Sequence, residues 1–190
     1  MTATLILDAK AQLGEGPIWS ARDQRLYWVD IDVGRVHVFD PVSGENRTIE
    51  IGQAVGTVVR RASGGLMLAL AHGFASLDLE TEKVEIICDP QPTGDTRFND
   101  GKCDPAGRFW AGTLDPTDAP ERGALYRLDA DLSVHTMLPK VTISNGLVWS
   151  LDEKTFYYID TPTACVAAFG ICRYEEASFA LSTDVLASAG

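Results

Sequence analysis

Three short polar phrases recur along this chain, and each places a side chain that bears an oxygen atom directly before a glycine. They read Gly14-Glu15-Gly16-Pro17, Asn99-Asp100-Gly101 and Ser144-Asn145-Gly146. Carboxylate and amide oxygens are the ligands that Ca²⁺ and Mg²⁺ prefer in proteins. No histidine or cysteine recurs with these phrases, which disfavours zinc. If the phrases meet in space, one carboxylate and two amides predict a site for a hard divalent cation.

A simpler interpretation of the phrases is that Asn and Asp before Gly form ordinary turns. Glu15 argues against it, because glutamate is a poor turn residue and here lies between two glycines and before a proline. Arg97, two residues before Asn99, is expected near the same point, where it could bind a carboxylate or hydroxyl oxygen of a ligand. The alternative for Arg97 is a surface arginine paired with an acid.

The phrases belong to an internal repeat that would bring them together. Aligned on Gly16, Gly56, Gly101 and Gly146, the repeat has spacings of 40, 45 and 45 residues, which is typical of propeller blades of four strands each. Short runs rich in β-branched and aromatic residues alternate with turn residues. Strands are predicted at 17–20, 25–30, 35–40, 48–51, 57–59, 66–70, 74–77, 84–87, 102–104, 109–113, 124–128, 134–138, 147–150, 156–160, 166–169 and 184–186.

The fold predicted from this pattern is an all-β, single-domain β-propeller over residues 1–190, because no stretch shows a helical period and the strands follow one another closely. A β-sandwich and an open solenoid are the alternatives, and the regular period argues against the sandwich. Four units would either close a small ring or form part of a larger one. Residues 4–7 are predicted to form a lone strand that completes the last blade. An open arc would favour self-association through blade edges.

Composition narrows the class of protein. The chain has 190 residues, 45% of them hydrophobic, and a net charge of −11. This charge disfavours nucleic acid and anionic membrane surfaces as partners. We see no signal peptide and no apolar run long enough for a membrane helix, so a cytoplasmic location is predicted. The four cysteines lack C-x-x-C spacing and are expected to be reduced. His37, His72 and His135 are expected to be strand or turn residues.

Six phrases in order resemble the SMP-30/gluconolactonase/LRE family of regucalcin-like lactonases, from about Leu5 to Phe169. They are Leu13–Trp19, Arg97–Lys102, Asp104–Thr113, Gly123–Tyr126, Ser144–Leu147 and Phe156–Thr161. The resemblance implies a six-bladed propeller, of which this chain holds about four blades. It also implies a divalent metal in the central channel, Ca²⁺ first, with Mn²⁺, Mg²⁺ or Zn²⁺ as alternatives.

The same resemblance assigns roles to individual residues. It implies that Glu15 and Asn145 are direct metal ligands. Asn99 matches a position that touches substrate or metal-bound water, and Arg97 matches a substrate-binding arginine. Glu121 matches an acid that contacts sugar hydroxyls, although the loop that carries it is shortened here. The loop 115–122 is expected either to cover the channel as a lid or simply to join two strands.

The chain departs from the family pattern at its C-terminus. Family members carry a further metal-binding aspartate, in a Pro-Asp-Gly phrase of the next blade, which also serves as the general base. This chain ends at Gly190 without such a phrase, so it is expected to be a truncated propeller with two of three ligand side chains and an unknown catalytic residue. Asp100 is a substitute base that the resemblance does not support.

The function expected from the resemblance is a metal-dependent sugar lactone hydrolase that opens an aldonolactone to the aldonic acid. The partner is then a small-molecule sugar lactone. One alternative is a catalytically incomplete metal-binding propeller or interaction module. Another is a complete small propeller with a different activity. Because the general-base aspartate is missing, the isolated chain is expected to be inactive or very weakly active.

Overall fold

The computed structural model describes residues 2–171 and 180–181, and these form sixteen β-strands and one short 3-10 turn, η1 (Thr161–Thr163). Blade 1 contains β1 (Gly14–Ser20), β2 (Arg25–Asp30), β3 (Arg35–Phe39) and β4 (Asn46–Glu50), and blade 2 contains β5 (Val55–Arg60), β6 (Leu66–Leu70), β7 (Gly73–Leu77) and β8 (Val84–Cys88). Blade 3 contains β9 (Arg97–Cys103), β10 (Phe109–Leu114), β11 (Gly123–Leu128) and β12 (Val134–Val141), and blade 4 contains β13 (Ser144–Trp149), β14 (Thr155–Asp160), β15 (Ala167–Gly170) and β16 (Ala180–Leu181).

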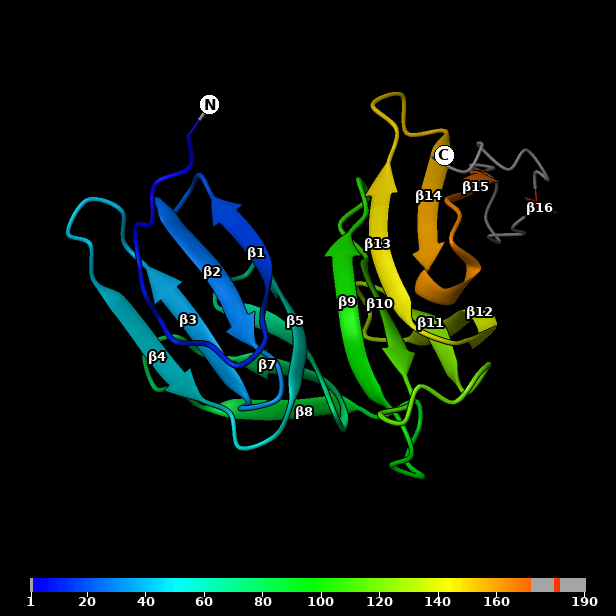
Figure 1. The fold of residues 1–190 in the computed structure, drawn as a ribbon, viewed down its shortest axis with the longest axis horizontal. Helices are drawn as coiled ribbons and strands as arrows, with labels where there is room; N and C mark the ends of the chain where they lie inside the picture. Colours follow the sequence, from blue (N-terminus) through cyan, green and yellow to red (C-terminus); the bar gives the residue numbers. More distant parts are fainter. Residues whose placement is uncertain (1, 172–179, 182–190) are drawn as a thin grey trace.

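Each blade is a four-stranded antiparallel meander in which the strand order follows the chain. The first strands of neighbouring blades contact one another, β1 with β5, β5 with β9 and β9 with β13, so we call them the inner strands. The blades are arranged radially around these strands (Figure 1). The structure confirms the predicted all-β propeller with four blades and excludes the sandwich, since no pair of large facing sheets is present among the described residues.

Hydrophobic clusters fill the space between neighbouring blades. One cluster joins blade 1 to blade 2 through residues such as Val29 and Leu68. A second joins blades 2 and 3, and a third, centred on Trp110 and Phe156, joins blades 3 and 4. Blades 2 and 3 are buried on both faces. This explains why the strand 66–70 is apolar without alternation, since both of its faces pack against a neighbour.

The inner strands begin earlier than predicted. The sequence pattern places the first strands of blades 1, 3 and 4 after the polar phrases, whereas the structure begins β1 at Gly14, β9 at Arg97 and β13 at Ser144. The phrases therefore lie within strands, and their interpretation as ordinary turns is wrong. Asn, Asp and Gly are depleted in strands in general, which is why a prediction from propensity began these strands too late.

Every inner strand contains a β-bulge, and in β1, β9 and β13 the bulge lies at the polar phrase. The register shifts between Glu15 and Ile18 in β1, between Val55 and Thr57 in β5, and between Asn145 and Leu147 in β13. In β9 the unpaired residue is Asn99, because Phe98 pairs with Thr113 and Asp100 with Gly112. A bulge bends its strand and re-aims the adjacent side chains, so the repeat places an irregularity where the candidate ligands lie.

The predicted N-terminal strand is wrong. Residues 2–11 have no strand structure, because a strand needs a partner edge and the described blades pair their own four strands. Instead, Ile6 and Leu7 line a pocket of about 370 Å³ together with Trp28 and Phe39 of blade 1. The predicted strand 184–186 lies outside the described residues, and the fourth strand of blade 4 is β16.

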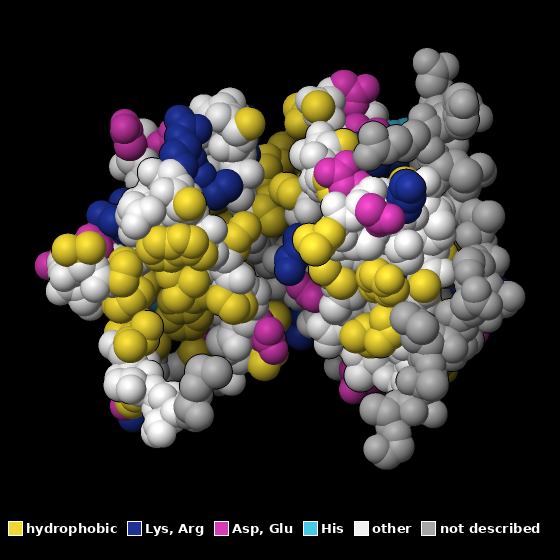
Figure 2. Space-filling model, turned by 90° about the horizontal axis from the view of Figure 1, so that it is seen from above, with side chains coloured by type: hydrophobic (Ala, Val, Ile, Leu, Met, Phe, Trp, Pro, Cys, Tyr) yellow, Lys and Arg dark blue, Asp and Glu magenta, His cyan; other side chains and the backbone are white. Residues whose placement is uncertain are grey.

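The blades form an open arc in the described part of the chain. Figure 1 shows blades 1 and 4 on opposite sides of a gap, and Figure 2 shows a hollow between the two halves of the molecule. No hydrophobic cluster of described residues joins blade 4 to blade 1. The closed four-bladed ring is therefore not what these residues form. No helix in the described ranges is long and apolar enough to cross a membrane.

Candidate metal and ligand site

All five residues predicted for the site lie toward one end of the propeller. We call this end the mouth, defined as the end at which the inner strands begin, at the lower ends of β1, β9 and β13 in Figure 1. Glu15 lies in β1, Arg97 and Asn99 in β9, and Asn145 in β13. Glu121 lies on the loop that joins β10 to β11, which starts at the mouth because Leu114 pairs with Arg97.

Glu15 and Asn145 occupy equivalent positions in blades 1 and 4. Each lies immediately before the bulge of its inner strand, Glu15 paired with Val29 and Asn145 paired with Ile159. Both residues are exposed. The two side chains therefore leave their strands at the same register, as the repeat alignment predicted.

An aspartate holds the backbone of the segment that leads into each of these two strands. The sequence pattern did not predict this repeated contact. Asp30 accepts the backbone N–H groups of Gln12 at 3.0 Å and Leu13 at 2.8 Å. Asp160 does the same in blade 4, accepting Thr142 N–H at 3.0 Å and Ile143 N–H at 2.8 Å. The signal that could have found them is the matching end of both second strands, Val29-Asp30 and Ile159-Asp160.

Blades 3 and 4 are tied together at the mouth by two side chains of β9. Asn99 donates from Nδ2 to the carbonyl oxygen of Ser144 at 2.8 Å. Asp100 accepts from the N–H of Gly146 at 2.8 Å through Oδ2 and from the N–H of Gly101 at 2.7 Å through Oδ1. Both carboxylate oxygens of Asp100 therefore hold backbone, which argues against its use as a substitute base.

Arg97 is the basic side chain beside this pair. Its Nη1 donates to the Phe98 carbonyl and to Asn99 Oδ1, both at 3.1 Å, and its Nη2 lies 3.6 Å from Asp32 Oδ1 of blade 1. The side chain is only 15% exposed. Burial lowers the pKa of Arg97, while the charges of Asp32 and Asp118 oppose that shift. Arg97 is thus oriented at the mouth with a long, displaceable ion pair.

Glu121 lies at the mouth, and its side chain forms no hydrogen bond or ion pair with any described residue. Its backbone adopts a left-handed conformation with φ of 57°, and its N–H donates to Thr142 Oγ1 at 3.1 Å. The loop 115–122 that carries it is held by Arg122, which forms ion pairs with Asp95 at 3.2 Å and Asp115 at 3.8 Å. These contacts hold the base of the loop next to Arg97, and its role as a lid stays a prediction.

The donor chemistry at the mouth fits a hard cation in part. Glu15 forms no side-chain hydrogen bond or ion pair with any described residue. Asn145 Oδ1 lies 3.2 Å from the N–H of Gly146, and its Nδ2 donates to Thr161 Oγ1 at 3.3 Å. Within the described ranges, no group of three His, Cys, Asp or Glu could hold a metal ion. Ca²⁺ takes six to eight oxygens, so these side chains supply only part of its shell.

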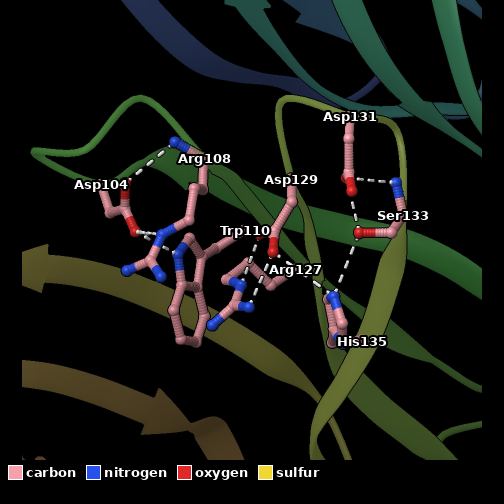
Figure 3. Close-up of polar contacts among 8 residues, drawn as sticks. All are labelled: Asp104, Arg108, Trp110, Arg127, Asp129, Asp131, Ser133 and His135. Atoms are coloured by element: carbon pink, nitrogen blue, oxygen red, sulfur yellow. Dashed lines mark hydrogen bonds and ion pairs between the residues drawn. The ribbon is translucent and has the colours of Figure 1, made fainter. Parts of the chain in front are cut away.

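A second polar cluster lies at the opposite end of blade 3 (Figure 3). Asp104 accepts from Trp110 Nε1 at 2.9 Å and from Arg108 Nε at 2.6 Å. Arg127 forms two hydrogen bonds to Asp129, at 2.6 and 2.8 Å, and its guanidinium lies 5.8 Å from the centre of the Trp110 ring. This network supports the hairpin turns at that end.

The same cluster contains an aspartate, a histidine and a serine, but not in catalytic order. His135 Nε2 lies 3.3 Å from Asp129 Oδ2 and also 3.2 Å from Ser133 Oγ. A Ser-His-Asp relay needs the acid and the serine on opposite ring nitrogens. Because both contact Nε2, these residues are a structural cluster. His37 also has a structural role, stacked on Trp28 at 3.8 Å within blade 1.

The cysteines in the described part of the chain form no disulfide. Cys88, Cys103 and Cys165 are free thiols. Burial, with a smaller contribution from Asp104, raises the pKa of Cys103 to about 11, so its nucleophilic thiolate form is scarce near neutral pH. Cys172 lies outside the described residues.

The fold and the mouth together define an oxygen-lined β-propeller. Residues 13–178 match the family described as "SMP-30/Gluconolactonase/LRE-like region", and the chain belongs to that family. It is 40% identical over 163 residues to the 6-deoxy-6-sulfogluconolactonase of Pseudomonas putida, which covers 85% of this chain and 56% of that protein. It is 38% identical over 166 residues to the regucalcin of Danio rerio, covering 86% of this chain and 56% of that one.

A solved structure supports the same relationship. The luciferin-regenerating enzyme superposes with a TM-score of 0.82 at 30% sequence identity, covering 86% of this chain and 57% of that one. The chain therefore spans a little over half the length of the relatives that it matches.

Proposed function

We propose that this chain forms the cation-binding and ligand-orienting part of a sugar lactone hydrolase, which opens an aldonolactone to the aldonic acid. The observation that carries the proposal is the equivalent placement of Glu15 and Asn145 before the bulges of β1 and β13. Family membership and the name of the lactonase relative support the substrate class.

Glu15 and Asn145 are the residues that would hold the divalent cation, with Ca²⁺ preferred for its affinity for carboxylate and amide oxygens. When bound, such a cation polarises a lactone carbonyl and stabilises negative charge on its oxygen. Glu15 suits this role because its carboxylate has no competing partner among the described residues. Asn145 suits it because its amide is exposed at the same register.

Arg97 and Asn99 would orient the sugar. The Arg97 guanidinium can exchange its 3.6 Å contact with Asp32 for a hydroxyl or ring oxygen of the ligand. Asn99 Nδ2 donates a hydrogen bond to the Ser144 carbonyl oxygen. Its Oδ1 accepts one hydrogen bond from Arg97 and has a second lone pair that can accept from a ligand hydroxyl. Glu121 would accept from another hydroxyl. We do not assign the role of proton acceptor to Glu15, because it is a proposed cation ligand. Nor do we assign it to Asp100, because its carboxylate holds two backbone N–H groups.

Because neither Glu15 nor Asp100 is assigned to that step, one second candidate is a propeller that binds the cation and sugar without turnover. The two functions separate cleanly in a titration and an assay on the same preparation. Binding without lactone hydrolysis would favour the second candidate.

The test is calorimetric titration of the metal-free 190-residue chain with Ca²⁺ or Mn²⁺, followed by proton release from glucono-1,5-lactone. Glu15→Gln and Asn145→Ala should each weaken cation binding by at least about tenfold, because the first replaces a charged carboxylate by a neutral amide and the second removes an amide oxygen. Glu45→Gln, which loses the same charge at the distant turn between β3 and β4, should bind like the parent. Arg97→Lys should weaken lactone binding without changing cation affinity. A folded chain that binds neither the cation nor the lactone would contradict the proposal.

A further inference from the structure

Two side chains of β9 form hydrogen bonds to the peptide groups on either side of the candidate ligand Asn145. The peptide group before Asn145 is held through the Ser144 carbonyl, which accepts from Asn99 Nδ2 at 2.8 Å. The peptide group after it is held through the Gly146 N–H, which donates to Asp100 Oδ2 at 2.8 Å. Fixing both flanking peptide planes fixes the backbone angles of Asn145 itself.

The Gly146 N–H has a second acceptor within reach. It lies 3.2 Å from Oδ1 of Asn145, the atom that would bind the cation. Asparagine side chains readily bond to backbone N–H groups nearby in the chain, and this local bond competes with other uses of the amide oxygen. The shorter, charge-assisted bond to Asp100 is the stronger of the two, so Asp100 draws the N–H away from the amide oxygen.

We propose that Asp100 is a positioning residue, which clamps the Gly146 peptide and thereby keeps the Asn145 amide oxygen available to a divalent cation. The inference rests on the proposed function for its cation, whereas the clamp itself rests on the contacts of Asp100. An aspartate is required here because both of its partners, Gly101 and Gly146, are N–H donors. An asparagine would turn an NH₂ group toward one of them.

The packing of blades 3 and 4 explains how a short side chain reaches the next blade. Asp100 pairs with Gly112 in the blade 3 sheet. A Cβ atom built on Gly112 would lie 1.9 Å from Ser144 Oγ, so glycine alone permits this approach. The two blades therefore approach closely at Ser144, the residue that precedes Asn145, which brings the Gly146 peptide within range of the carboxylate.

The experiment compares Asp100→Asn with Asp104→Asn in the 190-residue chain. Asp104 is a matched control, because it lies in the same blade and accepts three hydrogen bonds, from Arg108 N, Arg108 Nε and Trp110 Nε1, at the opposite end. The first readout is amide hydrogen exchange of metal-free protein. Asp100→Asn should lose protection at Gly146, and Asp104→Asn should retain it.

The second readout is the Kd for Mn²⁺. Loss of a residue that orients a ligand typically weakens metal binding by about ten- to a hundredfold, and we expect this for Asp100→Asn and not for Asp104→Asn, even where both lower Tm. If Asp100→Asn does not fold, Asp100→Ser removes the charge with a smaller side chain and is read in the same way.

Each result decides between the clamp and the cation proposal. Unchanged Gly146 exchange in Asp100→Asn overturns the clamp. Normal Mn²⁺ affinity with lost Gly146 protection overturns its role toward Asn145. A parent chain that binds no Mn²⁺, with Gly146 protection lost in Asp100→Asn, overturns the cation proposal and leaves only the backbone clamp.

Discussion

At the scale of single residues, three carboxylates near the mouth hold backbone N–H groups. Asp30, Asp160 and Asp100 each accept two N–H groups near the mouth. Such charge-assisted bonds are stronger than neutral ones and satisfy donors that would otherwise be unpaired. Glu15 stands apart because its exposed carboxylate has no such partner among the described residues. That contrast is what marks Glu15 as the candidate ligand.

A different carboxylate links blades 1 and 2 away from the mouth and predicts acid sensitivity. Asp23 Oδ2 accepts from Ser20 Oγ at 2.8 Å and Tyr27 Oη at 2.9 Å, and pairs with Arg60 of blade 2 at 2.6 Å. Burial alone would raise the pKa of Asp23, but these hydrogen bonds and the charge of Arg60 bring it below its ordinary value.

The lowered pKa fixes the sign of the pH dependence. The stabilisation by Asp23 is complete above the unfolded-state pKa of about 4 and is lost as the pH falls through the lower folded-state pKa. Asp23→Asn should therefore lower Tm at pH 7, and the gap to the parent should close on acidification below about pH 4. Thermal melts across pH, with the exposed Asp8→Asn as control, measure this. A gap that stays constant would contradict the assignment.

The candidate site could be predicted from sequence only to a limited depth. The position of the polar phrases in the repeat predicted that they share one end of the molecule, and the structure places Glu15, Arg97, Asn99, Glu121 and Asn145 there. Their roles came from a family resemblance and stay predictions. The contacts of Asp100 with the Gly146 peptide could not be predicted from sequence, because they depend on an approach between blades that no local pattern encodes.

At the scale of elements, the inner strands are shaped by bulges and close approaches. Strands 25–30 and 66–70 match their predicted bounds, because each is a short, largely apolar run bounded by turn residues. The inner strands were predicted too short, since their bulged residues break the alternation on which such predictions depend. Tertiary pairing overrode local preference there.

Gly56 in β5 shows how closely the inner strands approach. A Cβ atom built on it would lie 2.4 Å from both C and O of Phe98 in β9, and backbone atoms cannot move aside as a side chain can. Gly56→Ala should therefore destabilise the fold by at least about 2 kcal/mol. Gly170→Ala, where nothing lies within 4 Å, is the matched control and should be nearly neutral. Urea unfolding measures both, and equal stabilities would contradict the packing argument.

At the scale of the whole molecule, the open arc leaves apolar surface in contact with solvent. Leu5, Ile6 and Trp19 are 78, 69 and 48% exposed, and all three belong to blade 1 or the segment that lies before it. Figure 2 shows apolar side chains gathered over the half of the molecule that holds blade 1. Exposed apolar surface of this kind favours association.

We therefore expect the 190-residue chain to self-associate as its concentration rises, and Trp19→Gln to reduce that association. Val42→Gln is the control, because Val42 is 90% exposed but isolated on the turn between β3 and β4. Sedimentation velocity over a range of concentrations provides the measurement. A monomer at every concentration would show that the arc presents no adhesive surface.

The bulges also determine where this architecture tolerates changes in length. Side chains alternate across a strand, so deleting Gly146 would remove the bulge of β13 and turn either the mouth residues or the core residues of that strand to the wrong face. The loop 115–122 carries no such penalty, because added residues there shift no register. Insertions and deletions should therefore accumulate in the mouth loops and be rejected in the inner strands. Proteins with this fold can then change the ligand they bind through the mouth loops, while the residues of the inner strands keep their positions.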